Sequence, residues 1–163
     1  MRLFVHIVFI LIMFSLVTSC EAQELNNLMT NSDKREMVRL VNQARKMGVR
    51  CGKSWQKPVP PLKWDEVLQE AAAQKSSDMY KNKYFDHTSP EGETLSDRLD
   101  KLQYDWKTIG ENLAWGPTDV SKAVDGWLKS EGHCKNLMKA EYTHFGAAQY
   151  GTYWTQVFAK PVK

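Results

Sequence analysis

The sequence predicts an α+β domain in which helices cover an antiparallel sheet. Apolar residues recur at helical spacing through the first half of the chain, whereas residues 145–158 alternate as a pair of strands would. Helices that come early and strands that come late are typical of this class. The chain has 163 residues, 42% of them hydrophobic, which is enough for one folded domain with a single core.

The first segment has the pattern of an export signal. Arg2 precedes an apolar run of 15 residues, Leu3 to Val17, which is too short for a comfortable transmembrane helix. We therefore interpret residues 1–19 as a signal peptide. The run ends in Val17-Thr18-Ser19-Cys20, which resembles a bacterial lipobox and predicts a lipid on Cys20, with residues 20–33 as a tether. The alternative is ordinary cleavage near Ala22, which would release a soluble secreted protein.

Two helices are expected before residue 83. Ser32 can cap the first and Gly48 can end it, and its apolar face is Met37, Leu40, Val41, Ala44 and Met47. Residues 51–61 contain three prolines and should form a loop. The second helix should run from Asp65 to Asn82, with an apolar stripe formed by Val67, Leu68, Ala71, Ala72 and Met79.

Shorter elements follow. Residues 85–92 are rich in turn formers and predict a loop, and Leu95, Leu99 and Leu102 mark a short third helix. Alternation over residues 109–115 indicates a strand. A fourth helix should begin at Pro117-Thr118 and break at Gly132. The last two strands are expected at 145–150 and 153–158, joined by a turn at Gly151-Thr152.

The cysteines favour one disulfide. Cys20 lies at the processing site, which leaves Cys51 and Cys134. Two remaining cysteines in an oxidising compartment predict one bridge. A thiol nucleophile and a metal ligand stay open as alternatives, since His133 directly precedes Cys134.

The charge balance excludes one class of partner. With 22 basic and 19 acidic residues the formal charge is only +3. A nucleic-acid binder would need a basic face, so we expect no nucleic acid as partner. We expect a monomer.

Five short strings carry a family resemblance. In chain order they are Pro61-Leu62-Lys63-Trp64-Asp65, Tyr84-Phe85-Asp86-His87-Thr88-Ser89-Pro90, Gly110-Glu111-Asn112-Leu113-Ala114, Trp127-Leu128-Lys129-Ser130-Glu131-Gly132-His133 and Tyr153-Trp154-Thr155-Gln156-Val157-Phe158. In this order they resemble the CAP superfamily (SCP domains), which contains cysteine-rich secretory proteins, in its bacterial branch. The resemblance covers about residues 34–160, within a domain expected at 34–163. It implies an α-β-α sandwich around a three- or four-stranded antiparallel sheet.

The resemblance also implies a cleft with two histidines and two acidic residues, which holds a divalent metal in some members. His87 matches the first histidine and Glu111 the first glutamate. Ser130 stands in place of the second glutamate and Tyr153 in place of the second histidine, while His133 can enter the cleft from another backbone position. With two groups replaced, we expect no resident cofactor, and at most weak zinc binding through His87 and His133.

Glu111 is the most informative of these residues. On an extended strand it lies on one face with Ile109 and Leu113, and a carboxylate there needs a partner. We expect a hydrogen-bonded pair, either Tyr153–Glu111 or His87–Glu111, in a pocket that solvent can reach. A structural role for Glu111 stays open.

The function expected is binding rather than catalysis. The chain has no Gly-x-Ser-x-Gly elbow and no His-Glu-x-x-His string. We expect an exported interaction module, anchored by lipid to a bacterial membrane or cell surface, with an extracytoplasmic ligand that is lipid-like or derived from the envelope. The alternative is a hydrolase, metal-assisted or not, that uses His87 and Glu111. An envelope polymer would instead bind exposed aromatic residues such as Trp55, Trp106 or Trp115.

Overall fold

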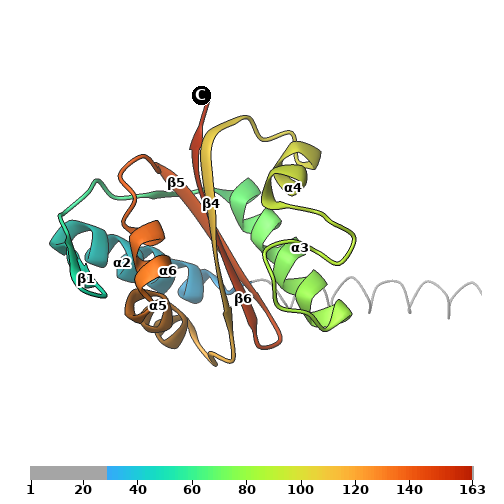
Figure 1. The fold of residues 1–163 in the computed structure, drawn as a ribbon, viewed down its shortest axis with the longest axis horizontal. Coiled ribbons are helices and arrows are strands. Elements are labelled where there is room, and N and C mark those ends of the chain that lie inside the picture. Colours follow the sequence, from blue (N-terminus) through green and yellow to red (C-terminus); the bar gives the residue numbers. More distant parts are fainter. Residues whose placement is uncertain (1–28, 163) are drawn as a thin grey trace, which may run out of the picture.

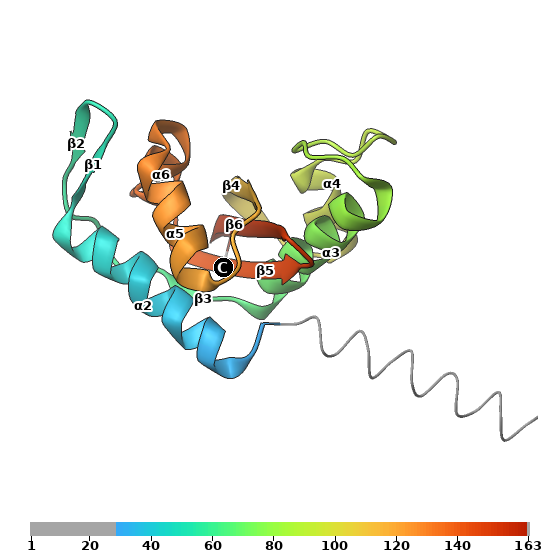
Figure 2. The same ribbon diagram turned by 90° about the horizontal axis from the view of Figure 1, so that it is seen from below.

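A four-stranded sheet lies between two layers of helices in the computed structural model, which describes residues 29–162 (Figure 1). The elements in chain order are α2 (Asn31–Met47), β1 (Val49–Cys51), β2 (Ser54–Gln56), β3 (Lys63–Trp64), α3 (Glu66–Asn82), α4 (Leu95–Lys101), β4 (Trp106–Trp115), α5 (Val120–Lys129), α6 (Glu131–Leu137), β5 (His144–Tyr150) and β6 (Tyr153–Pro161). Figure 2 shows α2, α5 and α6 on one side of the sheet and α3 and α4 on the other. The predicted α-β-α sandwich is confirmed. The signal peptide and the anchor at Cys20 lie outside the described residues.

The sheet has the strand order β3-β5-β6-β4, so β4 forms one edge. Strands β4, β5 and β6 pair antiparallel, as predicted. The fourth strand differs, because β3 pairs with β5 in parallel. It has only two residues, too few for an alternating pattern to show.

Several element boundaries differ from the prediction. Helix α5 begins at Val120, capped by Asp119, rather than at Pro117-Thr118, and β4 and β6 are longer than expected. Helix α2 begins earlier, because Thr30 rather than Ser32 caps it and Asp33 bonds back to complete a capping box. The predicted loop 51–61 contains part of a hairpin, β1–β2. Gly132 does not end a helix but lies inside α6. The break comes at Ser130, whose extended backbone (ψ 120°) separates α5 from α6.

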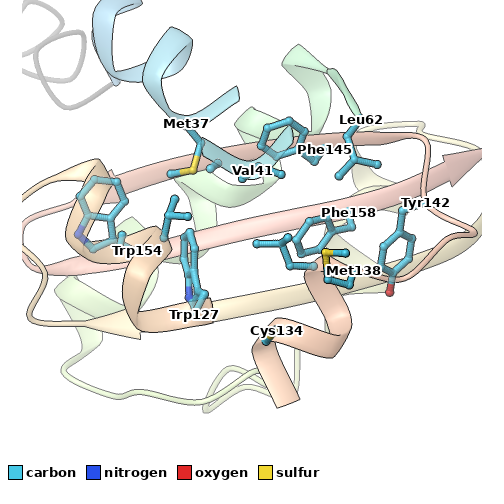
Figure 3. Close-up of a cluster of buried hydrophobic side chains, with 14 of the residues drawn as sticks. Met37, Val41, Leu62, Trp127, Cys134, Met138, Tyr142, Phe145, Trp154 and Phe158 are labelled. Atoms are coloured by element: carbon cyan, nitrogen blue, oxygen red, sulfur yellow. The ribbon is translucent and has the colours of Figure 1, made fainter. Parts of the chain in front are cut away.

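Each face of the sheet has its own core. The larger one joins α2, α5 and α6 to the sheet through residues such as Met37, Trp127, Phe145 and Phe158 (Figure 3). On the opposite face α3 and α4 pack on the sheet through Leu68, Ala71, Leu99 and Val157. No helix within residues 29–162 is long and apolar enough to cross a membrane.

The predicted disulfide is confirmed. Cys51 on β1 is bonded to Cys134 on α6, with Cα atoms 5.4 Å apart, and both residues are fully buried. The bridge fastens the small hairpin to the helical layer.

Helix α3 lies directly on β5 at Gly146. A Cβ atom there would come within 2.1 Å of the Gln69 amide nitrogen and 2.5 Å of the Leu68 carbonyl carbon. These are backbone atoms, so the whole helix would have to shift. We expect Gly146→Ala to lower the free energy of unfolding by about 1–3 kcal/mol, the usual range for overpacking. Denaturant unfolding measures it.

The control for this substitution is Gly126→Ala. Gly126 lies in α5 with nothing within 4 Å of the added carbon. Alanine there should raise stability by about 0.5–1 kcal/mol through helix propensity. Equal effects at the two positions would contradict the close approach of α3 to β5.

Candidate functional site

Glu111 on the edge strand β4 is the centre of the site. Its side chain is only 4% exposed, and its two oxygens have different partners. Oε2 accepts a short hydrogen bond from Nη2 of Arg98, which is 1% exposed. Oε1 lies 2.8 Å from Nδ1 of His87, whose side chain is 59% exposed. A buried ion pair therefore lies directly beneath an exposed imidazole.

The Gly-Glu-Asn string fastens β4 to α6. Gly110 needs to be glycine, because a Cβ atom would come within 2.1 Å of the Tyr142 hydroxyl. The buried Asn112 donates to the carbonyl of His133 at 3.1 Å. Asn136 on α6 donates to the Glu111 carbonyl at 3.1 Å and to Asn112 Oδ1 at 3.0 Å. These bonds fix the backbone from which Glu111 projects.

The loop that carries His87 is tied to α3 through Tyr84. The hydroxyl of Tyr84 accepts from Nζ of the buried Lys75 at 2.9 Å and donates a short bond to Asp78. Burial and the Asp78 carboxylate raise the pKa of Tyr84, so the hydroxyl stays protonated at neutral pH. Asp86 then turns the chain by accepting from the Thr88 amide at 2.9 Å. His87 is therefore held in place on both sides.

The two histidines of this region differ in electrostatics. The hydrogen bond to Glu111 raises the pKa of His87 above its ordinary value, against the opposing effect of burial. Burial lowers the pKa of His133, and the positive charge of His87 lowers it further. His133 therefore lies within electrostatic reach of His87.

We expect the two imidazoles to titrate on opposite sides of about 6.5, the ordinary histidine pKa. His87 should titrate above it and His133 below it. Because the folded-state pKa of His87 is raised, its contribution to stability is complete below about pH 6.5 and is lost as the pH rises through the folded-state pKa. Ring-proton NMR measures both titrations.

The matched variant is His87→Gln, which removes the positive charge that lowers the pKa of His133. The pKa of His133 should then rise, but not fully, because its burial remains. A His133 titration that does not move would show that the two rings are not coupled.

The other predicted site residues are more dispersed. Tyr153 lies on the same face of the sheet as Glu111, but it pairs with Trp115, whereas Glu111 pairs with Val157. Tyr153 and Val157, the strand partner of Glu111, lie four residues apart along β6, a span of about 13 Å. Within residues 29–162 the bonded pair is His87–Glu111, not Tyr153–Glu111. Ser130 forms the junction of α5 and α6 and makes no capping bond with its side chain.

Tyr153 belongs instead to an aromatic patch beside the site. Its ring stacks on Trp115 at 5.8 Å and contacts Phe85 at 6.3 Å and Tyr80 at 6.4 Å between centroids. Trp115 is 66% exposed, and Phe85 is two residues from His87. Of the other tryptophans considered, Trp55 is exposed in the β1–β2 hairpin, whereas Trp106 is partly buried against the α3–α4 core.

Arg98 was not identified from the sequence as a site residue, although its position in the helix indicated a buried partner. It lies in α4 at the spacing of Leu95, Leu99 and Leu102, on the face that packs inward. A basic residue on an apolar helical face needs a buried anion. Glu111, an acidic residue on an apolar strand face, is that anion.

The geometry defines what the imidazole can do. A carboxylate at Nδ1 holds the neutral ring as the Nδ1–H tautomer and leaves Nε2 as an outward acceptor. When protonated, the ring presents Nε2–H as a donor. Ser89 lies in the same loop, but it is buried, and its Oγ accepts from the Glu93 amide at 3.1 Å.

The weak zinc binding expected through His87 and His133 stays a prediction. No group of three or more His, Cys, Asp or Glu side chains with metal-binding geometry occurs within residues 29–162. Nδ1 of His87 is already occupied by Glu111, and Cys134 is in the disulfide. A structural zinc site takes four ligands and a catalytic one three. We therefore assign no step to a metal.

Comparison with known proteins gives a family match. The model of the cysteine-rich secretory protein family, CAP, matches residues 38–158. Two Bacillus subtilis proteins are similar in sequence: the uncharacterized membrane protein YlbC, 43% identical over 61% of this chain, and the uncharacterized protein YkwD, 40% identical over 60%. The matched parts are 29% of YlbC and 39% of YkwD, so this chain corresponds to a minor part of each.

Solved structures are similar as well. An extracellular protein of Bacillus anthracis that contains an SCP domain has a TM-score of 0.70 and 35% identity, over 80% of this chain and 41% of that one. An outer surface protein of Borrelia burgdorferi has a TM-score of 0.69 and 20% identity, over 82% of this chain and 97% of that one. At 20% identity, the similarity to the Borrelia burgdorferi protein is one of fold alone.

Proposed function

Because the chain belongs to the CAP family of cysteine-rich secretory proteins, we propose that it is an exported binding module of the bacterial cell envelope that binds its ligand around His87. The observation that carries the proposal is the buried Arg98–Glu111 pair, which fixes an exposed imidazole. Burying two charges is costly, and here the pair supports one outward-facing group. Fixed polar groups beside aromatic rings are typical of ligand sites.

The chemistry of the surface indicates the class of ligand. His87 offers one hydrogen-bonding nitrogen, and the exposed rings of Phe85 and Trp115, which pack on the buried Tyr153, offer aromatic surface at one side of it. This combination suits a ligand with an apolar or ring-shaped body and a polar end. A lipid-like or envelope-derived molecule has that form.

Export and anchoring are part of the proposal. The signal-like residues 1–19 and the disulfide Cys51–Cys134 both suit an oxidising compartment outside the cytoplasm. A lipid on Cys20 would hold the protein on a membrane. Intact mass of protein made in a bacterium that processes lipoproteins decides this, since an unmodified N-terminus at Gln23 or Glu24 would support the soluble alternative.

The binding proposal is tested by thermal unfolding in the presence of purified envelope fractions and lipids. A molecule that binds the native state raises the midpoint by mass action. We expect at least one envelope fraction or lipid to raise the thermal midpoint of the parent protein. This rise should disappear in His87→Ala and become smaller in Trp115→Ala. His144→Ala is the matched control, because His144 pairs with Lys63 at the opposite edge of the sheet. Equal stabilisation of all variants would place the ligand elsewhere.

A hydrolase is the second candidate, favoured by the Nδ1–H tautomer that Glu111 imposes. Nε2 of His87 then has the lone pair that a general base for water requires. In that case a defined hydrolytic activity should be lost in both His87→Ala and Glu111→Gln, while ligand binding persists in at least one of them. Loss of binding without any hydrolysis by the parent protein supports the module instead.

A further inference from the structure

The positive charge of the protein is concentrated in one segment. Residues 37–64 contain no acidic residue and seven basic ones: Arg39, Arg45, Lys46, Arg50, Lys53, Lys57 and Lys63. The other 135 residues hold 15 basic and 19 acidic side chains. The net charge of +3 is therefore the difference between a basic segment and a mildly acidic remainder.

This segment includes the β1–β2 hairpin, which stands out beyond the end of α2 (Figure 2). The two faces of the hairpin differ. Cys51 is fully buried and bonded to Cys134 of α6, so its side chain points toward the domain. Arg50 and Trp55 are cross-strand partners at the neighbouring position and are both exposed. Paired residues share a face, so these two side chains lie on the outward side.

Exposed apolar groups gather at the base of this outward face. Trp55 is 54% exposed and Met47, the last residue of α2, is 64% exposed. The indole ring lies over Gly48, where an added Cβ atom would be 2.9 Å from a ring carbon. The ring therefore lies against the residue that directly follows Met47. We name Met47, Arg50 and Trp55, with Lys46, Lys53 and Lys57, the hairpin platform.

The cations of the platform have no acidic partners. Lys46, Arg50, Lys53 and Lys57 are all exposed, and none forms an ion pair within residues 29–162. The guanidinium of Arg50 donates to the Lys53 carbonyl at 3.4 Å. Two lysines of α5 and α6 differ in this respect, because Lys129 is paired with Asp125 and Lys135 with Glu131. The charge of the platform is available to an external anion.

We propose that the hairpin platform docks on the surface of an anionic membrane. Tryptophan partitions to the boundary between headgroups and acyl chains, and neighbouring lysine and arginine side chains are attracted to anionic lipids. A soluble polyanion would use the cations alone and would leave Trp55 and Met47 in water. The disulfide supports the platform from behind, so docking needs no rearrangement. This proposal is independent of the ligand site at His87.

The test is cosedimentation with lipid vesicles. The protein is exported with Cys20→Ser, so that no lipid is attached there, and intact mass verifies one N-terminus for all variants. We expect binding to vesicles of phosphatidylcholine mixed with phosphatidylglycerol, and little to phosphatidylcholine alone. Each cation near the surface contributes roughly 1 kcal/mol, or about fivefold in affinity. The triple variant Arg50→Gln/Lys53→Gln/Lys57→Gln should therefore bind about 100-fold more weakly.

Two further variants separate the possible outcomes. Lys101→Gln/Lys122→Gln/Lys129→Gln removes the same charge elsewhere and should change binding only slightly, because these lysines are paired and lie outside the hairpin. Trp55→Ser keeps the cations and should weaken vesicle binding about tenfold, with unchanged binding to DNA or a glycerol phosphate polymer. Unchanged thermal midpoints show that the variants fold. If both triple variants lose binding equally, or if Trp55→Ser binds vesicles as the parent does, the membrane proposal is wrong.

Discussion

Replacing Glu111 with alanine is expected to lower the free energy of unfolding by about 3–5 kcal/mol, the range for removing one partner of a buried ion pair. Arg98 is 1% exposed, and Glu111 is the only hydrogen-bonding partner of its guanidinium within the described residues. Nε and Nη1 of Arg98 already lack a partner there. Without the carboxylate, a buried guanidinium would keep its charge with no anion beside it. Denaturant unfolding at neutral pH measures the loss.

The double variant Glu111→Leu/Arg98→Met provides the control. It removes both charges and leaves groups of similar volume, which is often neutral or stabilising. The single variant should therefore be much less stable than the double variant. A loss below about 1 kcal/mol for Glu111→Ala would mean that Arg98 finds water instead, and that the pair does not support His87 in the way we infer.

Three basic residues show where prediction from the sequence stopped. Arg45, Lys75 and Arg98 are all buried, and each lies on an apolar helical stripe that the spacing of hydrophobic residues identified. The stripes were predicted, but their basic members were not. Their partners come from distant segments: Arg45 donates to the carbonyls of Pro60, at 2.8 Å, and Leu137, at 2.7 Å. No local pattern contains that information.

Long, regular elements were predictable for a physical reason. Helix α3 has its apolar stripe and an Asp65 cap within one continuous segment, and the observed helix agrees with the prediction. The two-residue strand β3 and the hairpin β1–β2 depend on contacts with β5 and with Cys134, which lie about 80 residues away in the chain. Short elements of this kind are specified by their partners.

The candidate site was also predictable in part: local alternation indicated a partner for Glu111, but the position of Tyr153 depends on strand register. The alternation around Glu111 predicted a partner for the carboxylate, and His87 is one of the two partners found. The position of Tyr153 depends on the register between β4 and β6. In that register Tyr153 is opposite Trp115, and Val157 is opposite Glu111. The net charge of the chain did not predict how the charged residues are distributed. A total of +3 conceals a segment of 28 residues with seven cations and no anion.

Removing the disulfide should have the second large effect. Cys51 and Cys134 are separated by 83 residues, and closing a loop of that length restricts the unfolded chain by about 4–5 kcal/mol in the chain-entropy model. Native-state strain and residual structure commonly reduce the measured value. We therefore expect Cys51→Ala/Cys134→Ala to lower the free energy of unfolding by about 2–4 kcal/mol.

The effect should also be local, because the hairpin has few other attachments. Besides the bridge, Glu131 of α6 lies against Gly52, with a carboxylate oxygen 2.3 Å from where a Cβ atom would be. Amide hydrogen exchange in β1 and β2 should become faster in the double variant, while exchange in α3 and β6 follows global stability. Reducing the parent protein should reproduce both changes and should not affect the variant. If exchange accelerates equally in all elements, the bridge acts only on the unfolded chain. If it accelerates in the hairpin first, the bridge also orders the platform that carries Arg50 and Trp55, and reduction should then weaken membrane docking without altering the titration of His87.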